Sequence, residues 1–507
     1  MSELKALGVF VIDEEDTPSS ALFPGPLTDR GAVLAYVKRQ GGAPPVNEDL
    51  AYSYRAEPLP EPLKYGPEED DDEGRLGVVG LAGSEADDLS ETGWAILFGA
   101  KDPELNEKIK KQLKPLLDLR KSQAGEFYHE FDANNHPWQS GQSVEDWLGT
   151  FGDKSDKGIS ADDQVKPRKG VPFYIMIVAA PNDIPFEFQY RLDVYWAVGR
   201  LWLESIEDYG AYAEAVCADE TATVPAATRT ITYFAPEFRH DNGATKMVRY
   251  DLVEKLRESS LGDFDHTLIT SPHASRDKLL ELYTGHANRP ALYFVGSHGA
   301  LFNHAKGDSI ARCMGAIVTD VWADQPPPEG QTEVPAPVKT QYVAGRDLSR
   351  EVNLKGTIHI LCACYGAGWP KVSSYNGEPV SDDGPGIAQL PQRLLAKGAL
   401  AVLGHIDKAW TYSFVTSGGR DRSGKYEDVL IKLMKGRRAG NATDAFNYQW
   451  NVLASGFRDN TLGLSEKEKH DRRIEIDDAR NYVLLGDPAV RLRTDLMPVI
   501  KPKTPRA

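Results

Sequence analysis

Residues 291–299, ALYFVGSHG, and residues 357–368, TIHILCACYGAG, are the two most informative segments of the sequence. Each begins with a run of apolar, mostly β-branched or aromatic residues and ends near a reactive side chain, His298 or Cys364, with glycines beside it. Runs of this length and composition indicate buried strands. Because glycine permits tight turns and close approach of the backbone, the two segments predict strands that end in functional loops.

The same strand pattern recurs on both sides of these segments and alternates with helical periodicity. Further strands are predicted at Trp94–Phe98, Phe173–Ala179, Ile231–Ala235, His266–Thr270, Ala399–Leu403 and Asn481–Leu485. Helices are predicted at Asp102–Lys121, Val248–Ser259, Arg276–Tyr283, Ile387–Lys397, Tyr426–Met434 and Asn441–Leu453, with a long loop over Asn134–Lys169. Alternating strands and helices predict an α/β fold, with a parallel sheet covered by helices.

Changes in composition divide the 507 residues into four predicted regions. Residues 1–90 contain a strand candidate at Leu7–Ile12, many prolines and the acidic run EEDDDE at 68–73, and are expected to be irregular and regulatory. Residues 91–225 are predicted to form a first α/β subdomain, 226–495 the catalytic subdomain and 496–507 a tail. The proline-rich segment Asp324–Gln341 is predicted to be a surface connection.

Charge and cysteine content exclude several classes of protein. The net charge is −17, which argues against broad binding to nucleic acid or to anionic membranes. Four cysteines in a chain of this length do not form a disulfide framework and fit a reducing compartment. The sequence contains neither a secretory signal pattern nor a transmembrane run, so a cytoplasmic location is expected.

A cysteine and a histidine at the ends of neighbouring strands would form a nucleophilic site. In open parallel sheets, functional groups gather at the carboxyl ends of the strands. An imidazolium lowers the pKa of a nearby thiol and can protonate a leaving amine, while backbone N–H groups stabilise an oxyanion. The spacing of Cys362 and Cys364 does not match the usual zinc-ligand pairs, and no phosphate-binding glycine motif is present. No metal or cofactor is therefore expected, and Cys362 is expected to be a buried neighbour of Cys364 or a redox partner.

The two segments resemble the His-Gly and Ala-Cys-x-Gly motifs of caspase-like (clan CD) cysteine peptidases, in the same order. Three further stretches are similar to the gingipain family and the CHAT group. They are Pro172–Pro185, Asp193 with Val198–Leu201, and the closing Leu485–Gly486–Asp487–Pro488. The resemblance covers about residues 171–493 and implies a caspase-like αβα sandwich.

The resemblance also implies a role for each site residue. Cys364 would be the nucleophile, His298 its acid–base partner, and the N–H groups of Gly299 and Cys364 the oxyanion hole. Asp407 and Trp410 lie where such enzymes build the pocket for the residue before the scissile bond (P1). Asp407 would favour a basic P1 residue there, although a surface aspartate that caps a turn is the equal alternative.

The sequence therefore predicts a cysteine endopeptidase that acts on protein or peptide substrates and is restrained by processing or by a regulatory protein. Cleavage within Asp324–Gln341 is one expected route of maturation. Two alternatives stay open at this point. One is a catalytically silent scaffold with the same fold, and the other is a cysteine hydrolase that acts on small esters or amides rather than on peptides.

Overall fold

The structure is a computed structural model that describes most of the chain from residue 86 onward. The described residues are 9–12, 18–22, 86–151, 159, 165–239, 241, 243–259, 263–284, 288–302, 313–319, 339–375, 377–416, 419–459 and 464–499. The acidic run 68–73, most of the predicted region 1–90 and all but the last three residues of the connection 324–341 lie outside this set.

Among the described residues, ten strands form one central sheet in the order β4-β3-β5-β6-β17-β16-β13-β9-β7-β8. Their bounds are Tyr128–Phe131 (β4), Trp94–Phe98 (β3), Tyr174–Val178 (β5), Ala197–Arg200 (β6), Tyr482–Gly486 (β17), Ala401–His405 (β16), Ile358–Cys362 (β13), Pro290–Gly296 (β9), Thr228–Phe234 (β7) and Asp265–Ile269 (β8). The neighbouring strands are parallel, apart from the antiparallel pair β16–β17. The predicted α/β fold with a mostly parallel sheet is thus confirmed.

Strand β17 divides this sheet into two halves that run in opposite directions. It is parallel to β6 on one side and antiparallel to β16 on the other. We call β4-β3-β5-β6 the first half and β16-β13-β9-β7-β8 the second half. The carboxyl ends of the first set of strands therefore lie at one end of the strands of this continuous sheet, and those of the second set lie at the other end. The subdomain boundary near residue 225 remains a prediction.

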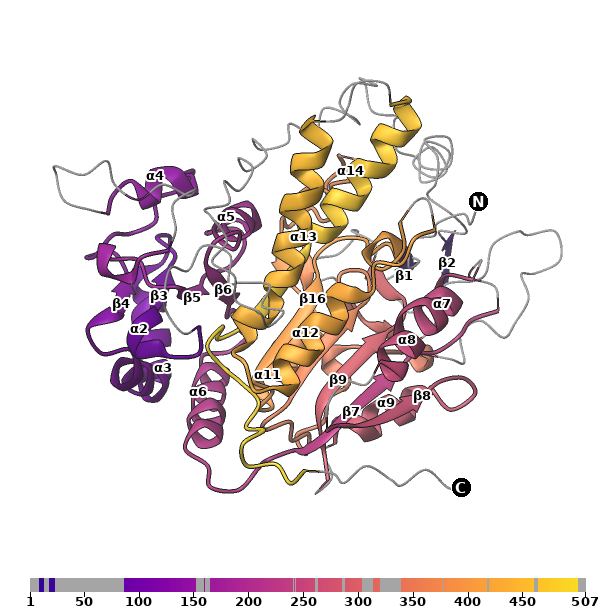
Figure 1. Cartoon of the computed structure of the whole chain (residues 1–507), viewed down its shortest axis with the longest axis horizontal. Helices are drawn as coiled ribbons and strands as arrows, with labels where there is room; N and C mark the ends of the chain where they lie inside the picture. Colours follow the sequence, from indigo (N-terminus) through magenta and orange to yellow (C-terminus); the bar gives the residue numbers. More distant parts are fainter. Residues whose placement is uncertain are drawn as a thin grey trace, which may run out of the picture.

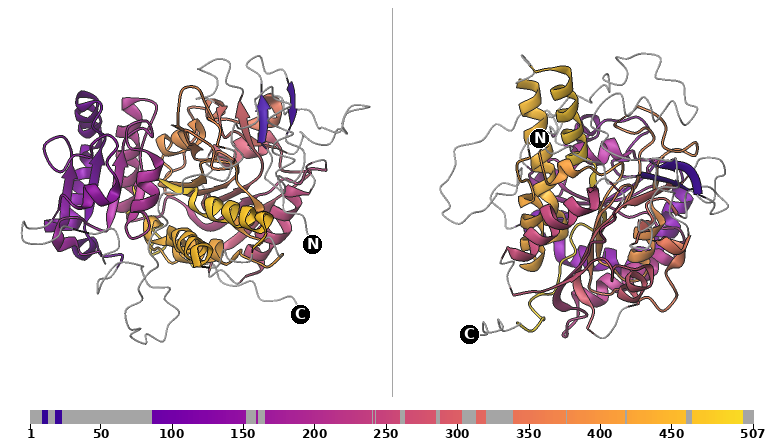
Figure 2. Two further views of the ribbon diagram at one scale, coloured as in Figure 1. Left: turned by 90° about the horizontal axis from the view of Figure 1, so that it is seen from above. Right: turned by 90° about the vertical axis from the view of Figure 1, so that its right-hand side faces the viewer.

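Helices cover both faces of the sheet, as the views in Figures 1 and 2 show. One face carries α12 (Gly424–Met434), α13 (Ala439–Asp459), α14 (Glu466–Arg480) and a continuous helix made of α7 (Ala244–Met247), η3 (Val248–Val253) and α8 (Glu254–Glu258). The other carries α3 (Pro103–Ala124), α6 (Ile206–Glu220), α9 (Arg276–Tyr283) and α11 (Gln389–Ala396). None of the helices among the described residues has the length and apolar character to cross a bilayer.

Several elements differ from the sequence-based expectation. The predicted loop 134–169 contains the short helix α4 (Val144–Leu148), which a capping box at Ser143 begins. Helices α5 (Phe186–Leu192), α6 and α14 and strands β4 and β6 were not predicted. Charged and polar residues interrupt the apolar pattern in these segments, so their hydrophobic periodicity is weak.

A network around Asp487 ties the first half of the sheet to the segment that directly follows β17. The Asp487 carboxylate accepts hydrogen bonds from Trp94 Nε1 at 2.9 Å and from Arg120 Nε at 2.7 Å, and Arg120 also pairs with Glu220 at 2.9 Å. At the same joint, a β-carbon at Gly199 would lie 2.3 Å from the carbonyl oxygen of the residue before Asp487. The segments around 198–201 and 485–488, which carried part of the family resemblance, therefore pack directly against each other.

A second, smaller sheet begins directly after His298. Strand β10 (Gly299–Phe302) pairs with β11 (Ile317–Val318), which pairs with β12 (Tyr342–Val343). On its other side, β10 is parallel to β1 (Val9–Ile12), which pairs with β2 (Pro18–Leu22). A segment from the start of the chain thus lies beside the loop that carries the predicted catalytic histidine.

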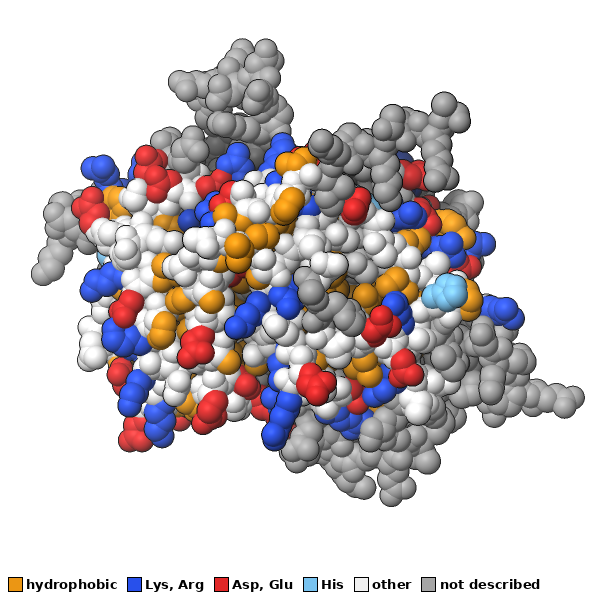
Figure 3. Space-filling view, turned by 90° about the horizontal axis from the view of Figure 1, so that it is seen from below, with side chains coloured by type: hydrophobic (Ala, Val, Ile, Leu, Met, Phe, Trp, Pro, Cys, Tyr) orange, Lys and Arg blue, Asp and Glu red, His pale blue; other side chains and the backbone are white. Residues whose placement is uncertain are grey.

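Charged side chains of both signs are interspersed on the face drawn in Figure 3. Lysine and arginine lie among aspartate and glutamate over the described residues of this face, without a continuous basic area. A broad surface for nucleic acid would need such an area.

Candidate active site

The strands that precede His298 and Cys364 are neighbours in the sheet. Strands β9 and β13 are parallel and in register from Leu292 opposite Ile358 to Gly296 opposite Cys362. His298 and Cys364 each lie two residues beyond the end of their strand. Because the two strands end at the same level, the loops that follow them lie side by side at the carboxyl ends of the strands. This adjacency was assumed in the sequence-based prediction.

The backbone of Gly299 lies directly against the backbone of Cys364. A β-carbon at position 299 would stand 1.8 Å from the carbonyl oxygen of Cys364 and 2.9 Å from its nitrogen. No side chain fits into that space, so the glycine after His298 is a steric requirement. This contact brings the two residues whose N–H groups were predicted to form an oxyanion hole to the same point.

The turn that carries Cys364 has an unusual conformation. Tyr365, the next residue, has φ of 55°, a left-handed value that side-chain-bearing residues seldom adopt. Its N–H donates to the carbonyl of Asp407 at 2.9 Å, and its own carbonyl packs against Gly315, where a β-carbon would lie only 2.1 Å away. Strained residues of this kind cluster at functional sites, where the surrounding structure holds them in place.

His298 is held by an aspartate that the sequence analysis did not identify. The imidazole is buried, stacks on Phe238 with ring centroids 5.4 Å apart, and its Nε2 lies 3.1 Å from Asp241 Oδ2. When Nε2–H donates to this carboxylate, the lone pair of the ring is on Nδ1. Asp241 therefore fixes both the orientation and the tautomer of the ring.

Asp241 itself is anchored at the start of helix α7. Its carboxylate accepts from the N–H of Thr245 at 2.8 Å, the hydroxyl of Thr245 at 2.6 Å and the N–H of Gly243 at 2.9 Å. Burial acts to raise the pKa of Asp241, but the bonds and charge of His298 and the bonds of Thr245 outweigh it and lower the pKa below its ordinary value. Asp241 follows strand β7, which pairs with β9 in the sheet. The only sequence signal for this residue was therefore its position as a polar residue after a predicted strand.

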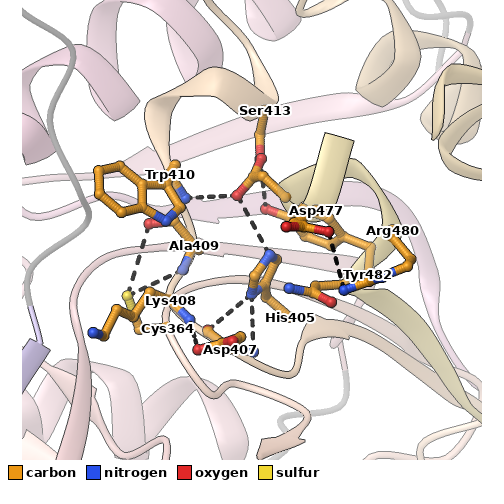
Figure 4. A network of polar contacts seen from close by, with 12 residues as sticks. Cys364, His405, Asp407, Lys408, Ala409, Trp410, Ser413, Asp477, Arg480 and Tyr482 are labelled. Carbon is orange, nitrogen blue, oxygen red and sulfur yellow. Dashed lines mark hydrogen bonds and ion pairs between the residues drawn. The ribbon is translucent and has the colours of Figure 1, made fainter. Parts of the chain in front are cut away.

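The thiol of Cys364 is covered by the loop after strand β16 (Figure 4). The residue is fully buried, its Sγ accepts a hydrogen bond from Ala409 N at 3.2 Å, and the carbonyl of Ala409 lies 3.8 Å away. Burial raises the pKa of the Cys364 thiol, and the Ala409 N–H and the charge of Lys408 offset this only in part. The thiol of Cys364 is therefore shielded from solvent in this structure.

The two predicted substrate-pocket residues belong to this covering loop. The Asp407 carboxylate is fully buried and accepts from the Ser373 hydroxyl at 3.1 Å, the Ser374 N–H at 2.8 Å and the Lys408 N–H at 2.8 Å. Trp410 is also buried and stacks obliquely on Tyr375, with ring centroids 5.3 Å apart. Both residues hold the loop in this arrangement, and their contact with a substrate remains a prediction.

Lys408 is a further residue of the covering loop whose side chain lies near Cys364. The residue is buried, and Figure 4 draws its side chain on the same side of the loop as Cys364. Burial lowers the pKa of Lys408, whereas the nearby Asp407, Cys364 and Glu378 act to raise it. The sequence pointed to Asp407 and Trp410 in this stretch and not to Lys408, because side-chain direction in a loop is not encoded in a simple pattern.

Buried polar groups beneath the loop tie it to helix α14. Asp478 accepts the N–H of Trp410 at 2.7 Å and the hydroxyl of Ser413, and it lies 3.3 Å from His405 Nε2. His405 is the last residue of β16, and its imidazole is fully buried. The loop 407–410 is therefore a hydrogen-bonded unit and not a free lid.

Cys362 has surroundings different from those of Cys364. Its Sγ lies 3.6 Å from the Tyr482 hydroxyl and 3.9 Å from the Tyr426 hydroxyl. Burial raises the pKa of Cys362 to about 11, against the lowering effect of these two hydroxyls. Within the described residues, no group of three His, Cys, Asp or Glu side chains converges as metal ligands would.

No protein-family model and no curated protein matches the chain. Among solved structures, it is similar to one titled "Structure of Protease", with a TM-score of 0.46 and 12% identity over 79% of this chain and 78% of that chain. It is also similar to two crystal structures of the Saccharomyces cerevisiae separase–securin complex, with TM-scores of 0.31 and 12% identity over 63% of this chain. The chain spans 16% of the length of that matched protein. These overlaps are too loose to assign a function, which depends on the geometry around Cys364 and His298.

Proposed function

We propose that this protein is a cysteine endopeptidase of the caspase-like kind, with Cys364 as nucleophile and His298 as acid–base partner. The observation that carries the proposal is the contact of the Gly299 backbone with the Cys364 backbone at the shared edge of β9 and β13. It supports the proposal because it brings the backbones of the two predicted oxyanion-hole residues together, beside the residue that carries the imidazole, and acyl transfer through a thioester requires a thiol, an imidazole and such N–H donors.

The proposed reaction begins with transfer of the thiol proton from Cys364 to Nδ1 of His298. The thiolate then attacks the carbonyl carbon of the scissile peptide, and the N–H groups of Gly299 and Cys364 stabilise the oxyanion. The imidazolium protonates the leaving amine, the C–N bond breaks, and a thioester remains on Cys364. His298 next takes a proton from the water that attacks the thioester, the C–S bond breaks to release the acid, and the imidazolium returns the proton to the Cys364 sulfur. Asp241 positions the ring throughout.

The proposal includes a resting state, because Cys364 is buried and held by Ala409. A substrate reaches the thiol only after the loop 407–410 moves away from it. A shielded thiol of this kind agrees with the expected regulation by processing or by a partner protein. Cleavage within 324–341 remains one proposed route to release of the loop.

A panel of peptidyl acyloxymethyl ketones with different P1 residues tests the proposed function, because these reagents alkylate a catalytic thiolate. Mass spectrometry of the protein after activation by limited proteolysis should locate one adduct on Cys364. The adduct should be absent in Cys364→Ser and greatly reduced in His298→Ala, and it should persist in Cys217→Ser, which removes a half-buried thiol in α6. Labelling at Cys364 that is indifferent to His298 would overturn the proposed dyad.

A catalytically silent scaffold is the second candidate, and the full burial of the Cys364 thiol favours it. The two functions differ in their response to limited proteolysis of the chain. A resting peptidase gains acyloxymethyl ketone labelling and peptide cleavage after nicking, and both are lost in Cys364→Ser. A scaffold gains neither from any nicked form.

A further inference from the structure

Strand β1 comes from the start of the chain and lies beside the residue that follows His298. It pairs in parallel with β10, from Val9 opposite Gly299 to Ile12 opposite Phe302. Strand β2 pairs with the other side of β1, and both strands are drawn in indigo in Figure 2. The N-terminal segment thus reaches the backbone of Gly299, a proposed oxyanion donor, without contributing a residue to the proposed catalytic machinery.

The backbone direction of Gly299 follows from the hydrogen bonds of its two neighbours. The N–H of Ala300 donates to the carbonyl of Ala316 at 2.9 Å. The carbonyl of His298 accepts from the N–H of Val318 at 3.0 Å. Both neighbours therefore direct these groups toward β11. Because consecutive residues of a strand direct their N–H and C=O groups to opposite sides, the N–H of Gly299 points to the other side of β10, where β1 lies.

The attachment of β1 to the rest of the protein is limited. Among the described strands, β1 pairs with β10 and β2 only, and β2 pairs with β1 only. A pair of strands is at best marginally stable by itself, so β1 and β2 lose their order when they leave β10. Segments that are attached in this way open at a low free-energy cost while the central sheet stays folded.

Strand β1 and the proposed reaction compete for the same backbone group. The reaction uses the N–H of Gly299 to stabilise the oxyanion, and a strand that pairs on this side of β10 occupies the space in front of that N–H. Loss of one oxyanion donor slows acyl transfer by about 10²–10³-fold. A paired β1 is therefore expected to slow the reaction.

We propose that β1 is a built-in inhibitory strand, which pairs with β10 in the resting protein, faces the N–H of Gly299 and withholds this donor from the oxyanion until the strand leaves. The inference rests on the proposed function, in which Gly299 is an oxyanion donor. It adds a second restraint to the loop 407–410, which shields the thiol rather than the oxyanion donor.

Phe10→Pro tests the pairing of this strand. Gly299 and Leu301 direct their backbone groups toward β1, so Phe10, which lies opposite Ala300 between them, directs its own toward β10. Proline has no N–H and breaks the ladder at this position. Val9→Pro is the matched control, because Val9 directs its N–H away from β10 and the first residue of a strand tolerates proline.

Hydrogen exchange with residue-level mass spectrometry measures whether β1 is released. The amide of Leu301 should exchange at least about tenfold faster in Phe10→Pro than in the wild type, because local opening sets the exchange rate. The amide of Ala300 should not change, since it donates to Ala316. Val9→Pro should match the wild type at both amides. The urea midpoint should stay constant in both variants, because β1 is not part of the central sheet.

Cleavage of a peptide substrate measures whether release of β1 affects the reaction. Each protein is first activated by the same limited proteolysis, and the forms compared are those that retain residues 1–22 by intact mass. In Phe10→Pro, kcat/KM should rise by about tenfold or more, because the donor of the oxyanion hole becomes available. In Val9→Pro, kcat/KM should equal that of the wild type.

Faster exchange at Leu301 with an unchanged or lower kcat/KM would overturn the inhibitory role of β1 and leave the proposed function intact. Exchange at Leu301 that Phe10→Pro does not alter would overturn it as well, because β1 would then not hold β10. Absence of cleavage in every activated form would contradict the proposed function itself and, with it, this role of β1.

Discussion

The two halves of the central sheet use the polar residues beyond their strands in different ways. In the first half, Arg200 ends β6 fully buried, and its guanidinium donates to Gln189 Oε1 at 2.8 Å and to the carbonyls of Ala179 at 2.9 Å and Pro185 at 3.2 Å. In the second half, the loops that carry His298 and Cys364 leave neighbouring strand ends and meet where Gly299 contacts the Cys364 backbone. The first half uses its polar groups to fix its own loops, whereas the second half carries the proposed reactive pair.

This difference predicts that the halves fail in different ways. Substitutions at the proposed site in the second half should lower the catalytic activity of a protein that still folds, because the polar groups there act on one another across loops. Substitutions in the first half and at the joint should lower the free energy of unfolding and leave the activity of the remaining folded molecules unchanged. The following experiments test that division, from the largest expected effect to the smallest.

Cys364→Ala gives the largest expected effect. It should lower kcat/KM of the activated protein by roughly 10⁴-fold or more, since loss of a nucleophile removes the covalent route. The urea midpoint should stay close to that of the wild type. The control Cys217→Ser should keep full activity, and any residual activity of Cys364→Ala near the wild-type level contradicts the assignment of the second half.

Arg120→Met tests the joint. It leaves the carboxylate of Asp487 buried without its cation and removes one of two cations from Glu220, so the free energy of unfolding should fall by about 3–5 kcal/mol. Equilibrium urea unfolding measures this loss. Lys114→Met on the same helix is the matched control, because Lys114 and its partner Asp118 are both exposed and such pairs contribute less than about 1 kcal/mol. Equal effects of the two variants would contradict the role of Asp487 in tying the first half to β17.

Gly299→Ala and Gly199→Ala compare the halves at the same substitution. The new β-carbon at 299 meets the Cys364 carbonyl, so kcat should fall by about 10²-fold or more through displacement of the oxyanion donors. The new β-carbon at 199 meets the Gly486 carbonyl and should cost roughly 1–3 kcal/mol of stability. Activity per folded molecule should survive in Gly199→Ala. A larger loss of activity in Gly199→Ala than in Gly299→Ala would contradict the division.

Asp241→Asn should lower kcat by about 10- to 100-fold with little change in KM, because it acts through the orientation of His298 and not on the substrate. Thr245→Ala separates positioning from folding. It removes the hydrogen bond from the Thr245 hydroxyl to the Asp241 carboxylate, and so weakens the attachment of Asp241 to α7, but it leaves the contact of Asp241 with His298. If Thr245→Ala lowers kcat as strongly as Asp241→Asn at equal stability, Asp241 is only a helix cap.

Asp193→Asn should give the smallest effect, visible in the pH dependence of stability. Burial raises the pKa of Asp193 to about 7, although its carboxylate accepts from Val198 N at 2.8 Å. The folded protein keeps a proton that the unfolded chain releases at a pKa of about 3.9, so this stabilisation is complete below that pH and is lost as the pH rises through 7.

Urea unfolding at several values between pH 5 and pH 8 measures this loss. Asp193→Asn should flatten the decline, because the asparagine does not ionise. The exposed Asp118→Asn on α3 is the control and should reproduce the wild-type slope. An unchanged slope in Asp193→Asn means that Asp193 is already ionised in the folded first half.

Much of the fold was predictable from the sequence because buried strands carry uninterrupted apolar runs. β3 and α9 begin and end at the predicted residues, and β9 and β13 lie within a residue or so of them. The order of strands in the sheet was not predictable, since it depends on how β17 inserts between β6 and β16. Local periodicity contains no information on that long-range pairing.

The candidate site divides in the same way. His298, Cys364 and Gly299 were predictable because each follows a strand in a glycine-rich turn. Asp241 and Ala409 were not, because they reach the site from other loops, and a hydrogen bond between distant loops leaves no spacing signal in one sequence. The full burial of the Asp407 carboxylate was also outside what the sequence could indicate.

The position of β17 has a consequence for the synthesis of the protein. Residues 482–486 are made after every other strand of the central sheet, yet they are the piece that connects β6 to β16. On the ribosome, the two halves can each pair their own strands, but they have no common hydrogen-bonded ladder until β17 leaves the exit tunnel. A chain interrupted before this strand therefore lacks the ladder that unites the two halves, so their union waits for the last strand of the sheet to emerge.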